Sequence, residues 1–239
     1  MPKYFFAILF FSFITGCNKQ NEIQKEQPAT VKADSVKNEI KSGIYEGIYN
    51  MNKHTNTFID CSNSDSVYFV IDETNKLEDQ YDKMFGEKSV YNSVVLKVKG
   101  DVEVTSDLTE AEKYPRTLRV REIISVEKKN FRNTCVPYDF WALGNEPNWS
   151  LEISKKENLI EFILPGESKS YYFFYSEPIQ ENGYIVYRNH NPIQRYLIDI
   201  KIKKEPCSDT MADISYEYSA EVELSDKRKF KGCGIKWKE

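Results

Sequence analysis

The first sixteen residues constrain this chain more than any other segment, because they decide in which compartment it folds. Met1 to Gly16 carries one basic residue, Lys3, and then an apolar run from Tyr4 to Ile14 without a charge. Such a run is typical of a secretory signal peptide and is too short to cross a bilayer as a stable helix. The chain is therefore predicted to be exported, and its fold has to be built from the residues that follow.

A cysteine closes this signal. Ile14-Thr15-Gly16-Cys17 resembles the lipobox of bacterial lipoproteins, with an aliphatic residue three positions before the cysteine and small residues just before it. The resemblance implies cleavage before Cys17, a diacylglyceryl group on its thiol and an acyl chain on its new amine. At about 0.8 kcal/mol per buried methylene, three chains make a permanent membrane anchor. The alternative is a plain secretory peptide that happens to end in cysteine.

The expected location is the bacterial cell envelope, lipid-anchored in the outer membrane on its periplasmic face or at the surface. Asn18 follows the cysteine, rather than the aspartate that retains some lipoproteins in the inner membrane, although this rule varies between bacteria. Residues 17–42 are predicted to form the lipidated start and a flexible tether, because residues 18–42 contain no aromatic residue and no glycine. A weak amphipathic helix around Thr30 to Ile40 is the competing interpretation.

Four further cysteines favour disulfides in an exported chain. They are Cys61, Cys135, Cys207 and Cys233. Four cysteines allow three pairings, and the sequence does not choose among them; Cys61–Cys135 and Cys207–Cys233 would each lie within one domain. Neither His54 nor His190 belongs to a cluster with closely spaced cysteines, so no metal site and no cofactor is predicted.

The first folded domain is predicted over residues 43–135. Alternating apolar residues indicate strands at 43–49, 57–61, 67–71, 93–105 and 116–127. Between the third and fourth, apolar residues recur at i, i+4, i+7 and i+8 from Leu77 to Phe85, which predicts an amphipathic helix over 73–85. Asp72 or Thr74 could cap it. Three strands, a helix and two strands is the order of a five-stranded OB-type barrel with one helix.

The same segments resemble a known domain. The motifs are YEGIY (45–49), FIDC (58–61), LEDQYDKMF (77–85) and VVLKVKGDVEV (94–104), with Cys135 at the end. Together they resemble the C-terminal OB-fold domain of NlpE-type envelope-stress lipoproteins. The N-terminal domain of that family, with its C-x-x-C pair associated with metal and redox sensing, has no counterpart in this sequence. The resemblance therefore implies the scaffold and not copper sensing.

Nucleic acid is not an expected partner, although OB folds often bind it. The chain has 33 Lys and Arg against 37 Asp and Glu and a pI near 5.5, whereas phosphate binding needs a surplus of cations. Basic residues on the last two predicted barrel strands are opposed by acidic neighbours. These residues are Lys97, Lys99, Arg116, Arg119 and Arg121, against Asp101, Glu103 and Glu122.

Residues 136–239 are predicted to form a second, all-β domain, an antiparallel sandwich or barrel. Strands are expected at 140–143, 149–154, 159–164, 170–175, 184–188, 196–203, 218–224 and 229–233, with turns such as Asn182-Gly183 between them. The segments FWALGNEPNWSLEI (140–153), CSDTMADISYEYSAEVEL (207–224) and FKGCGI (230–235) resemble a family of small bacterial envelope proteins of unsettled function with a GNEPxW motif. Asn148 stands where that pattern usually has an aromatic residue.

The GNEPNW segment supplies the candidate binding residues. Glu146 could act as a general base or contact a carbohydrate over Trp149 as a stacking floor, and Asp209 could join Glu146 as a carboxylate pair. The other interpretation is a structural turn, in which Asn145 tolerates left-handed geometry, Glu146 binds backbone amides and Trp149 fills the core.

Three function classes follow. The first is an envelope lipoprotein, not an enzyme, that acts as a binding or stress-sensing scaffold, with the membrane reached through Cys17 and an envelope protein as partner. The second is an inhibitor or glycan-binding module directed at a cell-wall hydrolase such as lysozyme, with Glu146 and Trp149 at the contact. The third and weakest is an acid/base hydrolase that uses Glu146 and Asp209.

Overall fold

The computed structural model describes residues 39–51, 56–85, 92–105, 111, 113–167, 169–209 and 214–238. All of them lie in one compact unit, Asn38–Glu239. The predicted signal peptide, Cys17 and residues 18–38 of the predicted tether lie outside the described residues. The first strand begins at Lys41, two residues before the predicted start of the first domain.

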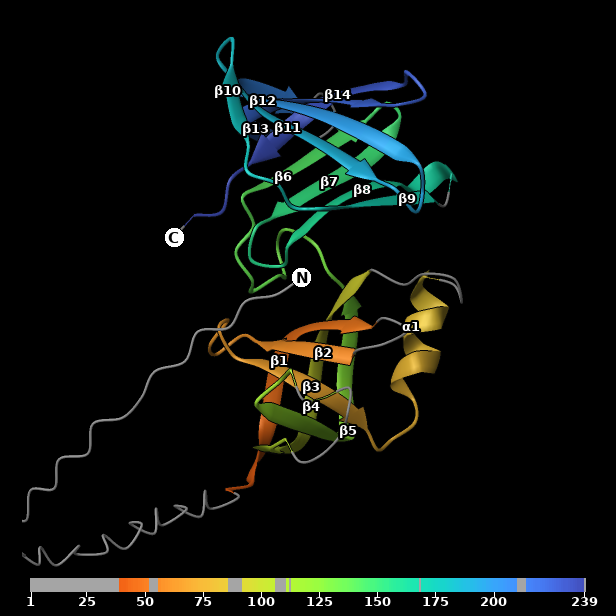
Figure 1. Cartoon of the computed structure of the whole chain (residues 1–239), viewed down its shortest axis with the longest axis vertical. Helices are drawn as coiled ribbons and strands as arrows, with labels where there is room; N and C mark the ends of the chain where they lie inside the picture. The colour runs from red at the N-terminus through yellow and green to blue at the C-terminus, as the bar shows by residue number, and fades with distance from the viewer. Residues whose placement is uncertain are drawn as a thin grey trace, which may run out of the picture. The chain divides into compact units, whose positions relative to one another are not determined.

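Five strands close a barrel (Figure 1). They are β1 (Lys41–Met51), β2 (Asn56–Asp60), β3 (Val67–Asp72), β4 (Ser93–Val104) and β5 (Arg116–Lys128). Their order around the barrel is β1-β2-β3-β5-β4, and the β3–β5 pair is parallel while the others are antiparallel. The prediction of a five-stranded OB-type barrel is confirmed.

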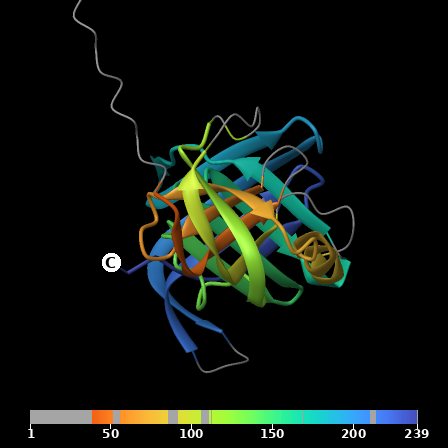
Figure 2. The same ribbon diagram turned by 90° about the horizontal axis from the view of Figure 1, so that it is seen from below.

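Among the residues described in this domain, one helix occurs: α1 (Leu77–Phe85), which lies beside the barrel strands (Figure 2). Leu77 and Tyr81 are buried and join the barrel core. The helix begins later than the predicted Glu73, because the carboxylate of Asp72 accepts the backbone N–H groups of Thr74 (2.9 Å), Lys76 (2.9 Å) and Leu77 (2.9 Å) and so holds 73–76 in a turn.

A linker runs from the barrel to the second domain and is fixed to both. A disulfide joins Cys61, just after β2, to Cys135, with the Cα atoms 5.4 Å apart. Val136 is fully buried against Ile48 and Ile59 of the barrel. The linker is thus part of the barrel's packing rather than a free connection.

The second domain is a single antiparallel sheet of nine strands that curls on itself (Figure 1). Its strands are β6 (Phe140–Asn145), β7 (Asn148–Ser154), β8 (Leu159–Leu164), β9 (Lys169–Phe174), β10 (Ile179–Glu181), β11 (Tyr184–Asn191), β12 (Tyr196–Asp209), β13 (Ile214–Leu224) and β14 (Lys229–Ile235), with a 3-10 turn at Pro165–Glu167. The order is β10-β11-β12-β13-β14-β6-β7-β8-β9. Eight of these strands were predicted; β10, three residues long, was not.

Side-chain amides bridge the seam where the curled sheet nearly closes. Asn189 and Asn191 of β11 donate to the backbone carbonyls of Phe174 (2.7 Å) and Tyr172 (2.5 Å) on β9. The side-chain oxygen of Gln194 accepts the backbone N–H of Tyr172 at 3.1 Å. The outer edge of β9 is therefore hydrogen-bonded although no ladder joins it to β11 among the described residues.

A second disulfide ties β12 to β14. The β12–β13 register shifts between Lys204 and Cys207, and this bend brings Cys207 to Cys233 with the Cα atoms 5.5 Å apart. Of the three possible pairings, the structure thus has the one that keeps each bridge within one domain. The predicted Asn182-Gly183 turn joins β10 to β11, with φ of 51° and 81°.

Candidate functional site

The GNEPNW segment forms the β6–β7 hairpin. Asn145 pairs with Asn148 across a two-residue turn in which the Glu146–Pro147 bond is cis, and residues 145–148 are all exposed. Trp149, directly after them, is 0% exposed. The exposed turn is therefore held by a residue that belongs to the core.

Trp149 is not the stacking floor considered for it, because its ring has no open face. Its indole N–H points to the backbone carbonyl of Lys231 at 3.3 Å. Gly144 and Gly232 leave room for the ring: a Cβ at Gly144 would come within 2.0 Å of the indole nitrogen, and one at Gly232 within 2.7 Å of the ring. The local packing explains the glycine on either side of the tryptophan.

The structure does not bring Glu146 and Asp209 together. β6 runs against β14 with Leu143 opposite Cys233, so the Glu146 turn lies near the start of β14. β13 runs against β14 with Tyr218 opposite Gly234, so the β12–β13 hairpin at Asp209 lies past the end of β14. Cys207 is bonded to Cys233, which lies opposite Leu143; Asp209 follows two residues beyond Cys207 toward the end of β14, and Glu146 follows three residues beyond Leu143 toward its start. At about 3.3 Å per strand residue, these positions are roughly 15 Å or more apart along the sheet. The side chain of Asp209 is outside the described part of the structure, but its backbone position alone separates the two carboxylates.

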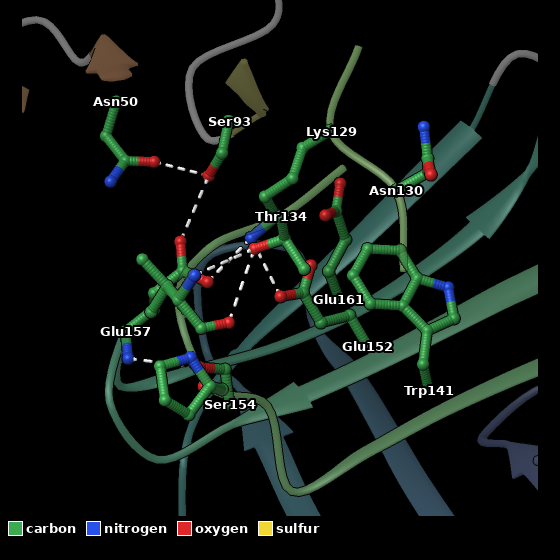
Figure 3. A network of polar contacts seen from close by, with 12 residues as sticks. Asn50, Ser93, Lys129, Asn130, Thr134, Trp141, Glu152, Ser154, Glu157 and Glu161 are labelled. Carbon is green, nitrogen blue, oxygen red and sulfur yellow. Dashed lines mark hydrogen bonds and ion pairs between the residues drawn. The ribbon is translucent and has the colours of Figure 1, made fainter. Parts of the chain in front are cut away.

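Instead, the structure assembles a buried charged cluster where the barrel, the linker and the sheet meet (Figure 3). Lys129, the first linker residue after β5, points into it and contacts Glu152 of β7 at 2.7 Å and Glu157 of the β7–β8 turn at 2.6 Å. These three side chains are 3%, 2% and 3% exposed. Glu161 of β8 lies beside them and is 6% exposed.

Polar residues of the barrel complete the cluster. The amide of Asn92 donates to Glu161 at 3.4 Å and its oxygen accepts the hydroxyl of Tyr172. Ser93 reaches Glu157 at 3.4 Å and also donates to Asn50. Hydrogen bonds therefore run into the sheet from Ser93 at the start of β4 and from Asn92 just before it, and Asn50 of β1 contacts Ser93.

The linker is hydrogen-bonded to the sheet next to this cluster. The hydroxyl of Ser154 donates to the carbonyl of Pro137 at 3.1 Å, and the backbone N–H of Asp139 donates to the carbonyl of Ile153 at 2.7 Å. The carboxylate of Asp139 accepts the backbone N–H of Lys155 at 2.7 Å. The cluster is thus held at a junction that is ordered on both sides.

Burial and mutual charge shift the titration of this cluster. Burial raises the pKa of Glu161 to about 7, against the opposing effect of Lys129 and of a hydrogen bond to Tyr172. Burial also raises the pKa of Glu152 well above its ordinary value, although Lys129 opposes this. For Lys129, burial alone would lower the pKa, but Glu152 and Glu157 outweigh it and the pKa is raised. Lys129 is therefore charged, and its single positive charge stabilises the ionised forms of both Glu152 and Glu157.

A groove of about 280 Å³ opens beside the cluster. The barrel contributes Asn50, Met51 and Thr57, and the sheet contributes residues 157–159, 172–174 and 190–193. Phe174 and Ile193 at its rim are 75% and 82% exposed. An open groove with apolar rim residues next to groups of shifted pKa is the kind of place where ligands and partners bind.

The sequence interpretation missed this cluster. One signal in the sequence could have pointed to it: Glu161 is a single acid within the apolar strand LIEFIL (159–164). Such an acid is either exposed at the edge of a sheet or buried together with a partner. Nothing local assigns Lys129 as that partner, because it lies 23 residues from Glu152 and 28 from Glu157.

Two other features are absent from the part of the chain that the structure describes. No group of three or more His, Cys, Asp or Glu side chains among them is arranged to hold a metal ion. No helix among them has the length and apolar character needed to span a bilayer.

Comparison with known proteins identifies the barrel. The family model of the NlpE C-terminal OB domain matches residues 39–134, which are the barrel, its helix and the start of the linker. The resemblance predicted for this domain is thereby confirmed. Neither the curated proteins nor the solved structures give a significant match. The resemblance of residues 137–239 to GNEPxW proteins stays a prediction.

Proposed function

We propose that this protein is a lipid-anchored component of the bacterial envelope whose two β domains act together as a non-enzymatic binding scaffold in envelope-stress sensing. The observation that carries the proposal is the match of the closed barrel to the NlpE C-terminal OB domain. The separation of Glu146 from Asp209 supports a binding role over hydrolysis, because the carboxylate pair predicted for the hydrolase is not assembled.

The groove at the junction is the surface proposed for the partner. Its exposed rim residues Phe174 and Ile193 offer apolar contact area on an ordered scaffold, and apolar and aromatic side chains in such places contribute most to protein recognition. The proposed partner is another envelope protein.

The anchor and the partner surface are tested in the native bacterium with two separate readouts. An alkyne analogue of palmitate should label the wild-type chain and not a Cys17→Ser variant. A photo-crosslinking amino acid at Ile193 should capture a specific envelope protein, whereas the same probe at Ile179, an isoleucine on β10 that is 50% exposed, should not. If Cys17 were not labelled, the proposed lipid anchor would be refuted. If the probe captured the same protein equally at both positions, the groove would be refuted as the partner surface.

A second candidate function is inhibition of a cell-wall hydrolase such as lysozyme. The observation in its favour is the exposed, acidic turn at Glu146, which Trp149 anchors rigidly to the core. A carboxylate on such a turn would assist association with a strongly basic enzyme. The purified chain should then inhibit lysozyme, and Glu146→Gln should weaken inhibition and its salt dependence; no inhibition at micromolar protein would eliminate this function.

A further inference from the structure

The buried cluster holds more acid than base. Glu152 lies directly opposite Glu161 on neighbouring strands, and Glu157 follows in the turn between them. Within the described part of the chain, Lys129 is the cation bonded to these carboxyls. If all three acids were ionised, the site would contain an excess of two negative charges with almost no access to water.

Such an excess is unfavourable, and a buried acid avoids it by keeping its proton. Like charges directly opposite each other on one face of a sheet repel, and burial strengthens the repulsion. One oxygen of Glu152, Oε2, is buried without a hydrogen-bond partner in the described structure. An unpaired oxygen is tolerated on a neutral carboxyl far better than on a carboxylate.

The groups that pack over the acids from the barrel do not correct the charge. Asn92 bonds to Glu161, Ser93 bonds to Glu157, and Asn50 bonds to Ser93; all three are uncharged. An ion pair between Lys156 and Asp65 of the barrel lies at the rim, where Lys156 is already matched by an acid. The titratable and charged groups around the pair are Lys129 and Tyr138 of the linker, Glu157 of the turn, Tyr172 of β9, and Lys156 with Asp65.

We propose that the Glu152–Glu161 pair binds a proton when the barrel packs on the sheet, so that the junction is a proton-linked latch, closed in mild acid and loosened as the pH rises to neutral. Opening the junction would return the acids to water, where they ionise freely. Closing it requires at least one of them to be neutral. The device gives an envelope protein a structural response to external pH that does not depend on the identity of its partner.

The direction and size of the response follow from Glu161. Its pKa is about 7 in the closed junction and near 4.5 in water, so its stabilising contribution is complete below about 4.5 and is lost as the pH rises through about 7. Between pH 5.5 and 7.5 this difference changes the opening equilibrium by about 20-fold, with the open form favoured at the higher pH.

Hydrogen–deuterium exchange of the full chain measures this opening. Exchange at pH 5.5 and 7.5, corrected for the intrinsic pH dependence of amide exchange, should show junction peptides (128–139 and 150–162) opening about 20-fold more at pH 7.5. Peptides of β12–β13 should show no such change. Equal protection of the junction peptides at the two pH values would overturn the proposal.

Two variants assign the effect to the proton. Glu161→Gln is neutral at every pH and nearly the same shape, so its junction should stay closed at both pH values. Glu223→Gln, on the outer face of β13, should behave as wild type. A wild-type pH response in Glu161→Gln would refute the assignment. If Glu161→Gln does not fold, the test is an NMR titration of the wild type that follows the chemical shift of the Glu161 side-chain carboxyl carbon against pH. A titration midpoint about two pH units above that of an ordinary glutamate supports the latch, and an ordinary midpoint overturns it.

Discussion

Replacing Lys129 by methionine should strongly destabilise the protein, because it removes the ammonium that is bonded to the buried carboxylates of Glu152 and Glu157. Its nitrogen lies 2.7 Å from Glu152 and 2.6 Å from Glu157, and all three side chains are at most 3% exposed. At an effective dielectric constant of about 20, each contact corresponds to about 6 kcal/mol of Coulomb energy. Protonation of a carboxyl and local relaxation recover part of this, so we expect a loss of about 3–5 kcal/mol in the free energy of unfolding.

The assay is thermal unfolding at pH 7 followed by calorimetry and near-UV circular dichroism. For a unit of this size the expected loss lowers Tm by about 6–20 °C. Lys97→Met is the matched control, since Lys97 makes a 3.0 Å pair with Glu46 but both side chains are about half exposed, at 42% and 52%. That variant should lose less than about 1 kcal/mol.

A rescue experiment separates charge from packing. If the loss comes from uncompensated carboxylates, the triple variant Lys129→Met, Glu152→Gln, Glu157→Gln should regain most of the stability that Lys129→Met loses. A Lys129→Met protein as stable as Lys97→Met, or a triple variant no better than Lys129→Met, would refute the electrostatic account of the junction.

Two more predictions concern covalent and steric features. Cys61→Ser opens a loop of 74 residues and should lower the urea midpoint, with a loss of at most about 4.4 kcal/mol in the free energy of unfolding. Dithiothreitol at a concentration that reduces only this bridge should lower the midpoint of the wild type and leave that of Cys61→Ser unchanged. Gly232→Ala would place a Cβ 2.0 Å from the Leu143 carbonyl and should cost about 1–3 kcal/mol or more, whereas Gly166→Ala, which meets nothing within 4 Å, should be nearly neutral in the same urea titration. An unchanged midpoint for Gly232→Ala would contradict the close packing around the Trp149 ring.

The sequence by itself determined the elements of the fold. The residues rich in Val, Leu and Ile at 93–105 and 116–127 were enough to predict two long strands, which the structure has at 93–104 and 116–128. The apolar stripe from Leu77 to Phe85 likewise predicted α1. Its start was misplaced because the Asp72 carboxylate, rather than a helical hydrogen bond, holds the four residues before Leu77.

Only the tertiary structure decided which side chains form the candidate site. Lys129, Glu152 and Glu161 carry charges that, in a sequence, are typical of exposed positions, and their burial follows from the packing of the barrel and linker on the outer face of the sheet. In the same way Trp149, the residue that most suggested a binding surface, is enclosed by two glycines from separate strands. Periodicity reports which face of an element is apolar; what covers the other face depends on contacts between residues far apart in the chain, and those contacts leave no local pattern.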